Sequence, residues 1–274
     1  MKSKLTDALP LITVAMPIYN AGEYLPDAVN SIIAQTYTNW ELFIIDDGST
    51  DNAINSVESI KDARIKILND GLNKGLAARL NQAIDLAKGQ YFARMDQDDI
   101  SMPERFKMQL GVLENDPSLD LVSTRAVNIS MQGMPVGYSP FAITHDEITA
   151  APWIGFYMVH PTWMGKLSWF KKYLYKVPQS YYSEDFELLL RAYENSKFAC
   201  LPDVLFQYRV RNKIKWKNQL KARKAVLKLQ TQYFFHQRRY LYIALSLLVF
   251  MLRVTSDANK IIKQFFSKTQ TTIS

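Results

Sequence analysis

Two groups of aspartates stand at positions where they could act together. The pair Asp46-Asp47 directly follows the apolar run 42–45, and the turn 96–99, which holds three aspartates, follows the apolar run 91–95. Short apolar runs indicate strands, and in an open α/β sheet ligands bind beyond the carboxyl ends of the strands. Carboxylates gathered there repel one another unless a cation or solvent relieves them. The pattern therefore indicates a site for a divalent cation and a nucleoside diphosphate.

Other common means of binding phosphate or forming covalent intermediates are missing from the sequence. It contains no G-x-G-x-x-G loop, no G-x-x-x-x-G-K-[ST] loop and no G-x-S-x-G elbow, and its histidines form no H-x-x-x-H pair. The single cysteine, Cys200, excludes a disulfide framework and a thiolate metal cluster. If a phosphate ester is bound here, a metal held by carboxylates must take its negative charge.

The elements that must position these carboxylates alternate along the chain. Strands are predicted at 11–16, 42–45, 65–68 and 91–95, and helices at 25–33, 54–60, 76–87 and from 103 onward. Gly89 is predicted to cap the third helix, and Ser101 and Glu104 have the spacing of a capping box for the fourth. Helices between successive strands predict an α/β fold with a mostly parallel central sheet flanked by helices.

Net charge divides the chain in two. Residues 1–210 carry 19 Lys and Arg against 25 Asp and Glu, whereas residues 211–274 carry 14 against 1, a net charge of +13. We therefore predict a catalytic domain over residues 1–212 and a helical C-terminal extension over residues 213–274. A basic extension suits an anionic partner such as phospholipid or nucleic acid.

The extension itself has two parts. The first interleaves cations with apolar residues, as in a basic amphipathic helix. Its cations are Lys213, Lys215, Lys217, Lys221, Arg223, Lys224 and Lys228. The second, Tyr240 to Leu252, has 13 uncharged residues, fewer than the roughly 20 that a spanning helix needs. It is expected either to enter one leaflet of a membrane or to pack against the catalytic domain.

Several segments, taken in order from about residue 11 to 212, resemble the successive blocks of family 2 glycosyltransferases. They are Val14–Asn20, Ser31–Tyr37, Phe43–Asp51, Asn73–Ala78, Ala93–Ser101, Pro103–Phe106, His160–Thr162 and Glu184-Asp185. The resemblance implies a GT-A fold, a nucleotide-diphosphate sugar as donor, and inversion at the anomeric carbon. It also implies that Pro17, Tyr19 and Asp47 line the nucleoside pocket, with Tyr19 stacking and Asp47 accepting from a base imide.

The remaining roles also follow from the resemblance. Asp96 and Asp98 correspond to its D-x-D pair, so Asp98 is expected to bind Mn²⁺ or Mg²⁺, and Asp96 to reach the ribose or the metal and its waters. Asp185 corresponds to the general base that takes the acceptor proton. Contacts to acceptor or phosphate are expected from Glu184 and His160, with a structural role as the alternative for each.

Downstream of the base the sequence departs from the family. Many members have a Trp-Leu pair and an Arg/Gln-rich motif there, whereas this chain has Phe186–Arg191 and then Gln207–Arg211. In this chain, Arg209 or Arg211 is expected to contact the diphosphate. Asp99 is expected either to orient the acidic turn or to cap the following helix.

The family resemblance and the basic C-terminal extension together imply a bacterial enzyme that takes part in the synthesis of a surface polysaccharide. The expected acceptor is a lipid-linked saccharide, and the expected location is cytoplasmic, peripheral on the inner face of the cell membrane. The extension would bind its anionic surface, and no nucleic acid is expected as partner. Two alternatives remain open: a nucleotidyltransferase with a similar metal site, and a nucleic-acid-binding protein that uses the basic tail.

Overall fold

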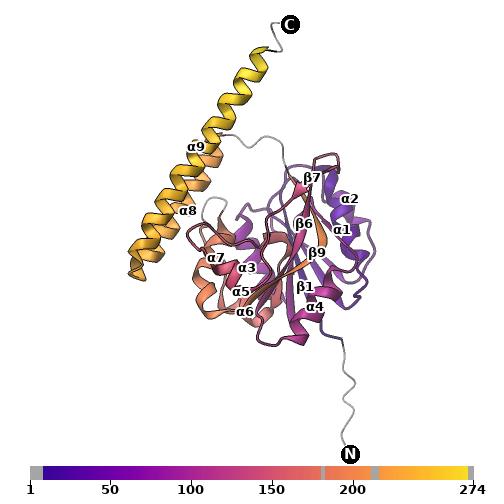
Figure 1. Cartoon of the computed structure of the whole chain (residues 1–274). Coiled ribbons are helices and arrows are strands. Elements are labelled where there is room, and N and C mark those ends of the chain that lie inside the picture. Colours follow the sequence, from indigo (N-terminus) through magenta and orange to yellow (C-terminus); the bar gives the residue numbers. More distant parts are fainter. Residues whose placement is uncertain (1–8, 180–182, 211–215, 271–274) are drawn as a thin grey trace, which may run out of the picture.

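The computed structural model describes residues 9–179, 183–210 and 216–270, with side chains described as far as Asn259 (Figure 1). The strands are β1 (Ile12–Ile18), β2 (Trp40–Asp46), β3 (Ile65–Asn69), β4 (Tyr91–Arg94), β5 (Ile100–Ser101), β6 (Leu121–Ile129), β7 (Pro135–Tyr138), β8 (Met164–Lys166) and β9 (Phe198–Arg209). The helices are α1 (Leu25–Ile33), α2 (Asn55–Glu58), α3 (Leu76–Leu86), α4 (Arg105–Asn115), α5 (His145–Thr149), α6 (Leu167–Lys172), α7 (Glu184–Ala192), α8 (Trp216–His236) and α9 (Tyr240–Gln270). Short 3-10 turns are η1 (Gly22–Tyr24), η2 (His160–Thr162) and η3 (Tyr193–Asn195).

One sheet joins all the described strands. Its order is β3-β2-β1-β4-β8-β6-β9-β5, and β7 pairs with β6 outside this path. The first four strands run parallel, as their alternation with helices predicted. The rest of the sheet is mixed, because β8 runs antiparallel to both β4 and β6 while β6 and β9 run parallel. The fold is therefore the expected α/β class, all-parallel in its N-terminal half and mixed in the rest.

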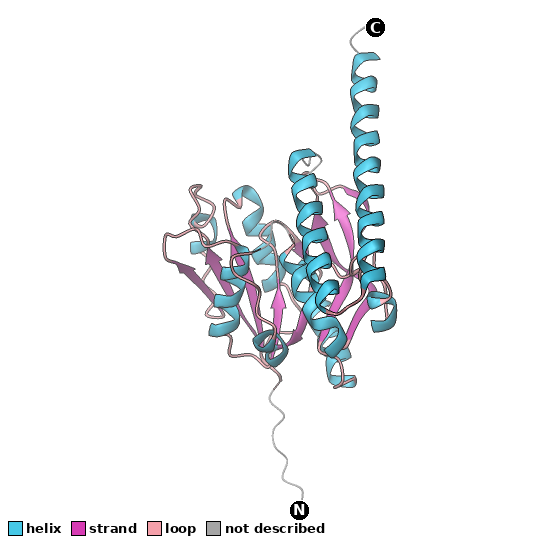
Figure 2. Ribbon diagram, turned by 90° about the vertical axis from the view of Figure 1, so that its left-hand side faces the viewer, coloured by secondary structure: helices cyan, strands magenta, loops and turns pink. Residues whose placement is uncertain are grey.

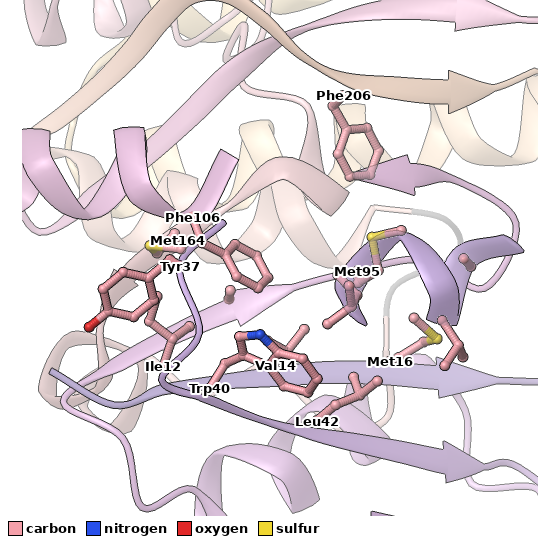
Figure 3. Packing of buried hydrophobic residues seen from close by; sticks show 14 of the residues in the cluster. Ile12, Val14, Met16, Tyr37, Trp40, Leu42, Met95, Phe106, Met164 and Phe206 are labelled. Atoms are coloured by element: carbon pink, nitrogen blue, oxygen red, sulfur yellow. The ribbon is translucent and has the colours of Figure 1, made fainter. Parts of the chain in front are cut away.

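Two apolar layers cover the sheet. Along β1, Ile12, Val14 and Met16 face one buried cluster and Ala15 faces the other, since side chains alternate across a strand. The first cluster packs against α1, α2 and α4, and part of it is seen in Figure 3. The second packs against α3, α6 and α7. Every residue of β1 and β2 is consequently buried, which is typical of central parallel strands.

Two local predictions were wrong. Gly89 does not cap α3, which ends at Leu86 with Ala87 in an extended conformation. A Cβ at Gly89 would lie 2.5 Å from the carbonyl oxygen of Leu11, so close backbone approach is what requires glycine there. Ser101 forms no capping box, since its hydroxyl accepts a hydrogen bond from Gln35 Nε2 at 3.0 Å and α4 begins without a side-chain cap.

The C-terminal extension forms a helical hairpin. Helices α8 and α9 lie side by side in both views (Figures 1 and 2). The predicted boundary at residues 212 and 213 lies outside the described residues, as do Arg211, Lys213 and Lys215. Within the described chain, one stretch, Tyr240–Asn259, is long and apolar enough to cross a membrane, with a mean hydropathy of 1.6 over 20 residues. The expectation that this segment is too short to span was thus based on too narrow a window.

Candidate active site

The carboxyl ends of β1, β2 and β4 meet at one edge of the sheet, as the sequence predicted for its two acidic groups. The backbone N–H of Met95 donates to the carbonyl of Ala15 at 3.0 Å, which places the acidic turn 96–99 beside the end of β1. The Gln97 side chain then bonds Tyr19 reciprocally. Its Oε1 accepts from the Tyr19 N–H at 2.6 Å, and its Nε2 donates to the Tyr19 carbonyl at 3.0 Å. The backbone at Tyr19 is therefore fixed to the acidic turn, while its side chain is half exposed.

Asp47 lies at the start of α3. Its carboxylate accepts backbone N–H bonds from Lys74 at 2.7 Å and Gly75 at 3.0 Å, an arrangement that the helix dipole favours. It also accepts from Nε of Arg79 at 2.8 Å, and both side chains are buried. The expected contact of Asp47 with a nucleobase stays a prediction. What the geometry adds is that Asp47 holds the loop 70–75 against the end of β2.

Asp46 and Pro17 support this edge of the sheet. Asp46 is buried, with Oδ1 accepting from the Ser49 N–H at 2.9 Å and Oδ2 from Asn69 Nδ2 at 3.0 Å. Pro17 is also buried, in β1, in register with Ile45 of β2. The Tyr19 ring is thus the more accessible of the predicted nucleoside contacts.

The acidic turn is organised by three arginines. Arg94, at the end of β4, is buried and pairs with Asp96 at 2.8 Å. Arg105, in the first turn of α4, is buried as well and donates to the Arg94 carbonyl at 2.8 Å. Arg209, at the end of β9, donates from its backbone N–H to Oδ1 of Asp99 at 2.7 Å. The turn is thereby tied to β4 and β9, while Arg105 ties α4 to the end of β4.

Asp99 orients the turn and does not cap a helix. It is fully buried, and α4 begins six residues later with Glu104 as its N-cap residue. Burial, reinforced by the charge of Asp96, raises the pKa of Asp99 well above its usual value. Of the two roles expected for Asp99, the orienting one is therefore confirmed.

The guanidinium of Arg209, predicted to contact phosphate, binds backbone oxygens instead. Its Nε donates to the Asp98 carbonyl at 2.7 Å, and its Nη1 donates to the carbonyls of Ser130 and Met131 at 3.1 Å each. The guanidinium also lies over the Tyr24 ring, 4.5 Å from its centroid. In this state Arg209 holds backbone oxygens together, and its contact with diphosphate remains a prediction.

A second acidic group begins α7. Glu184 and Asp185 are its first two residues and are half-buried. Burial, followed by the charge of Asp185, raises the pKa of Glu184 to about 7. Burial also raises the pKa of Asp185, and there the positive charge of Arg94 acts in the opposite direction. Because the charges of Arg94 and Asp96 both act on this pair, the two acidic groups share one electrostatic environment.

The charge of Arg94 acts on His160 as well. It is buried on η2, its Nε2 is 2.7 Å from the Tyr175 hydroxyl, and its ring centroid is 4.5 Å from that of Trp163. Burial and the charge of Arg94 lower its pKa well below the usual value, so the imidazole is neutral. These contacts favour the structural role that the sequence left open for His160, and its expected contact with acceptor or phosphate is untested.

The donor set of the acidic turn fits a hard divalent cation. Among the described residues, no three His, Cys, Asp or Glu side chains come together as a complete metal site. Asp96 and Asp98 nevertheless offer half-buried carboxylate oxygens at one turn. Mg²⁺ and similar ions are commonly held by one or two carboxylates, with waters and substrate phosphates completing the coordination. The residues present are therefore sufficient for such an ion once a diphosphate is bound.

Sequence reasoning assigned no role to several residues that build this site. Arg105 lies beneath the turn, Gln97 fixes Tyr19, and Tyr175 holds His160. A signal existed for Arg105 alone, because an arginine in the first turn of the helix that follows an acidic cluster is well placed to neutralise it. Gln97 and Tyr175 act through contacts between segments that are distant in sequence, which no local pattern reveals.

Comparisons with known proteins agree with this geometry. The family described as Glycosyl transferase family 2 matches residues 13–174, which include the acidic turn but not Glu184 and Asp185. The chain is also similar to the UDP-Glc:alpha-D-GlcNAc-diphosphoundecaprenol beta-1,3-glucosyltransferase WfgD of Escherichia coli, with 38% identity over 103 residues. That match covers 38% of this chain and 41% of WfgD, so it spans less than half of either protein.

Solved structures share the fold. TarS of S. aureus, in complex with UDP-GlcNAc, superposes with a TM-score of 0.63 at 19% identity, over 80% of this chain and 66% of that one. The mannosyltransferase PcManGT of Pyrobaculum calidifontis, in complex with GDP-Man and Mn²⁺, gives 0.62 at 14% identity, over 95% and 81%. These similarities show a GT-A fold for the chain.

Proposed function

Because the chain belongs to glycosyl transferase family 2, we propose that it is an inverting, metal-dependent glycosyltransferase. It would move a sugar from a nucleotide-diphosphate sugar to an acceptor hydroxyl. The observation that carries the proposal is that the acidic turn 96–99 and the acidic start of α7 share one environment around Arg94. One group suits the diphosphate and the other suits the proton that must leave the acceptor.

On the donor side, Asp96 and Asp98 would hold Mn²⁺ or Mg²⁺ through their carboxylate oxygens. Such an ion neutralises the charge that develops on the departing nucleoside diphosphate. Its arrival would weaken the pairing of Arg94 with Asp96, since both cations compete for one carboxylate. The half-exposed ring of Tyr19 would stack on the base, and Pro17 and Asp47 would complete the nucleoside pocket.

On the acceptor side, Asp185 would act as the general base. Its carboxylate takes the proton of the acceptor hydroxyl as the acceptor oxygen bonds to the anomeric carbon. The bond from that carbon to the diphosphate oxygen breaks, its electron pair leaves with the diphosphate, and the configuration inverts. A pKa raised by burial makes Asp185 a stronger base, while the charge of Arg94 acts in the opposite direction and favours the ionised carboxylate.

We propose a lipid-linked saccharide as the acceptor, in the synthesis of a bacterial surface polysaccharide. The printed name of WfgD, which specifies a sugar on diphosphoundecaprenol, supports this class. The net charge of +13 over residues 211–274 supports attachment to the anionic inner face of the cell membrane. Glu184 and His160 are proposed on the acceptor side, and Arg209 next to the diphosphate.

Donor hydrolysis across a panel of nucleotide sugars, with and without Mn²⁺, tests the chemistry. We expect metal-dependent release of free nucleoside diphosphate, and its loss in Asp96→Ala/Asp98→Ala. The matched control is Asp116→Ala/Asp120→Ala, which alters two aspartates remote from the acidic turn. Unchanged turnover after the first double substitution, or with excess chelator, would contradict the proposal, and release of pyrophosphate would indicate a nucleotidyltransferase instead. Salt-dependent DNA binding without donor hydrolysis would indicate a nucleic-acid-binding protein.

A further inference from the structure

The outward face of α9 is apolar over more than three turns. Its exposed residues recur every three or four positions and so form one stripe along the helix. They are Tyr240, Leu241, Ala244, Leu247, Leu248, Met251 and Leu252. Leu241 is 69% exposed and Leu252 is 60% exposed. Such a large apolar surface on the outside of a protein indicates a docking site.

A stripe of cations runs along the neighbouring helix. Lys217, Lys221, Lys224 and Lys228 are exposed at the same three- and four-residue spacing on α8. Phe235 continues this stripe at the end of α8, and its ring lies 6.2 Å from that of Tyr240, where the α9 stripe begins. The cationic and apolar stripes therefore meet at the tip of the hairpin.

The two helices of the hairpin contact each other at more than one level along their length. Near its tip the rings of Phe234 and Tyr242 lie 5.3 Å apart, and about three turns further along Arg223 pairs with the buried Asp257 at 2.5 Å. Asp257, a charged residue of α9, therefore faces α8 and points away from the apolar stripe. Passing α9 through a bilayer would carry the lysines of α8 into the hydrocarbon, which is costly.

The hairpin tip is fastened to the helix that begins with the proposed base. Arg239 bonds the Tyr193 hydroxyl at 2.8 Å and Glu194 at 2.7 Å. Both belong to η3, which follows α7 directly, and Asp185 lies at the other end of α7, roughly 12 Å away along the helix axis. The orientation of the hairpin consequently sets the orientation of the acceptor side of the site.

We propose that the α8–α9 hairpin lies in the plane of an anionic membrane, with the α9 stripe in the acyl region of one leaflet and the α8 lysines against the lipid phosphates. Charge selects this occupant over a second copy of the chain, because pairing two hairpins through these faces would bring two lysine stripes together. The inference deepens the membrane attachment of the proposed function and does not depend on the chemistry at Asp185.

Sedimentation of the full-length protein with vesicles tests the stripes. On phosphatidylcholine vesicles that contain phosphatidylglycerol, we expect Leu248→Glu/Met251→Glu to reduce the partition coefficient on the order of a hundredfold or more. Lys221→Gln/Lys224→Gln should reduce it about thirtyfold on the same vesicles and little on phosphatidylcholine alone. The controls alter similarly exposed residues elsewhere: Met134→Glu/Val136→Glu, just before and on β7, and Lys171→Gln/Lys172→Gln on α6. Equal losses in variants and controls would overturn the assignment.

Depth measurements separate an in-plane helix from a spanning one. A nitroxide attached to Leu241→Cys, Leu248→Cys or Leu252→Cys, one at a time, reports depth; Cys200 is buried and leaves the new thiol as the reactive one. The inference predicts similar depths at the three positions, about 5–10 Å below the headgroups. A spanning helix would separate the first and last by roughly 16 Å, which would overturn it.

Two further measurements complete the test. Light scattering should show a monomer, and a dimer that Leu248→Glu dissociates would overturn the choice of occupant. Turnover of a soluble acceptor should be unchanged in Leu248→Glu/Met251→Glu. An active wild-type enzyme that does not bind vesicles would defeat the inference and leave the proposed glycosyl transfer standing, and an inactive protein that binds vesicles would do the reverse.

Discussion

Replacing Arg79 by methionine isolates the ion pair that holds the loop 70–75 in place. The Arg79 side chain is 1% exposed, and its guanidinium donates to Asp47 at 2.8 Å and to Asp70 at 2.6 Å. It also donates to Gln82 at 2.9 Å and to the carbonyl of Leu72. Methionine would fill much of the same volume but supply none of these bonds.

The two carboxylates contribute unequally to the expected loss of stability. Asp47 is buried, and stranding one member of a buried pair costs about 3–5 kcal/mol. Asp70 is 35% exposed, so solvent screens its pairing with Arg79 and makes its share the smaller one. Asp47 keeps its backbone bonds from Lys74 and Gly75, which favours the lower end of the range. We expect Arg79→Met to lower the free energy of unfolding by about 3 kcal/mol and the melting temperature by roughly 6–12 °C.

Urea denaturation followed by tryptophan fluorescence measures this loss. Lys197→Met is the matched control, because its pair with Asp116 at 3.3 Å is about half exposed and screened by solvent, so its loss should change the stability little. Adding Asp47→Asn to Arg79→Met should recover part of the stability by removing the stranded charge. Because the loop borders the donor site, KM for the donor should rise more than kcat falls. A loss no larger than that of Lys197→Met would refute the reasoning from burial.

Three other predictions concern the base, its electrostatic neighbour and the packing of the sheet. Asp185→Asn should abolish transfer and leave donor affinity intact, and measurable turnover in that variant would remove Asp185 from the role of base. The charge of Arg94 lowers the pKa of Asp185, so Arg94→Gln should raise that pKa and move the acid limb of the pH–rate profile to higher pH. Arg94→Lys keeps the charge and should leave the acid limb nearer that of the wild type. Coincident profiles for the two variants would contradict this. A Cβ at Gly89 would lie 2.5 Å from the carbonyl oxygen of Leu11, so Gly89→Ala should destabilise the protein, while Gly111→Ala, in open space on α4, should stabilise it by about 0.5–1 kcal/mol. Urea denaturation of both variants decides, and equal effects would contradict the close-approach argument.

Periodicity located the first half of the fold because local pattern and burial agree there. Strands β1 to β4 and helices α1 to α4 appear where apolar spacing placed them. The mixed second half was not predicted, because β8 has only three residues and its direction depends on β4 and β6, which are distant in sequence. The caps expected at Gly89 and Ser101 failed for a related reason, since partners from other segments decided both positions.

The candidate site divides in the same way. The sequence pattern placed carboxylates at the ends of β2 and β4, and the family resemblance added Glu184 and Asp185 and gave all of them roles. The sequence could not show that Asp47 accepts hydrogen bonds at the start of α3, or that the Arg209 guanidinium donates to the carbonyls of Asp98 and Ser130. Those facts depend on which segments meet, and they decide which side chains retain capacity for a substrate.

The sequence by itself determined which residue types are available: acidic groups after apolar runs, a basic extension, and blocks that resemble one enzyme family. These properties are readable because they depend on neighbours in the chain. Only the tertiary structure decided that the charge of Arg94 acts on two acidic groups some ninety residues apart, and that the cations and apolar residues of the extension form adjoining stripes. Electrostatic and hydrophobic effects act through distance and solvent exposure, and both are fixed only when the chain has folded.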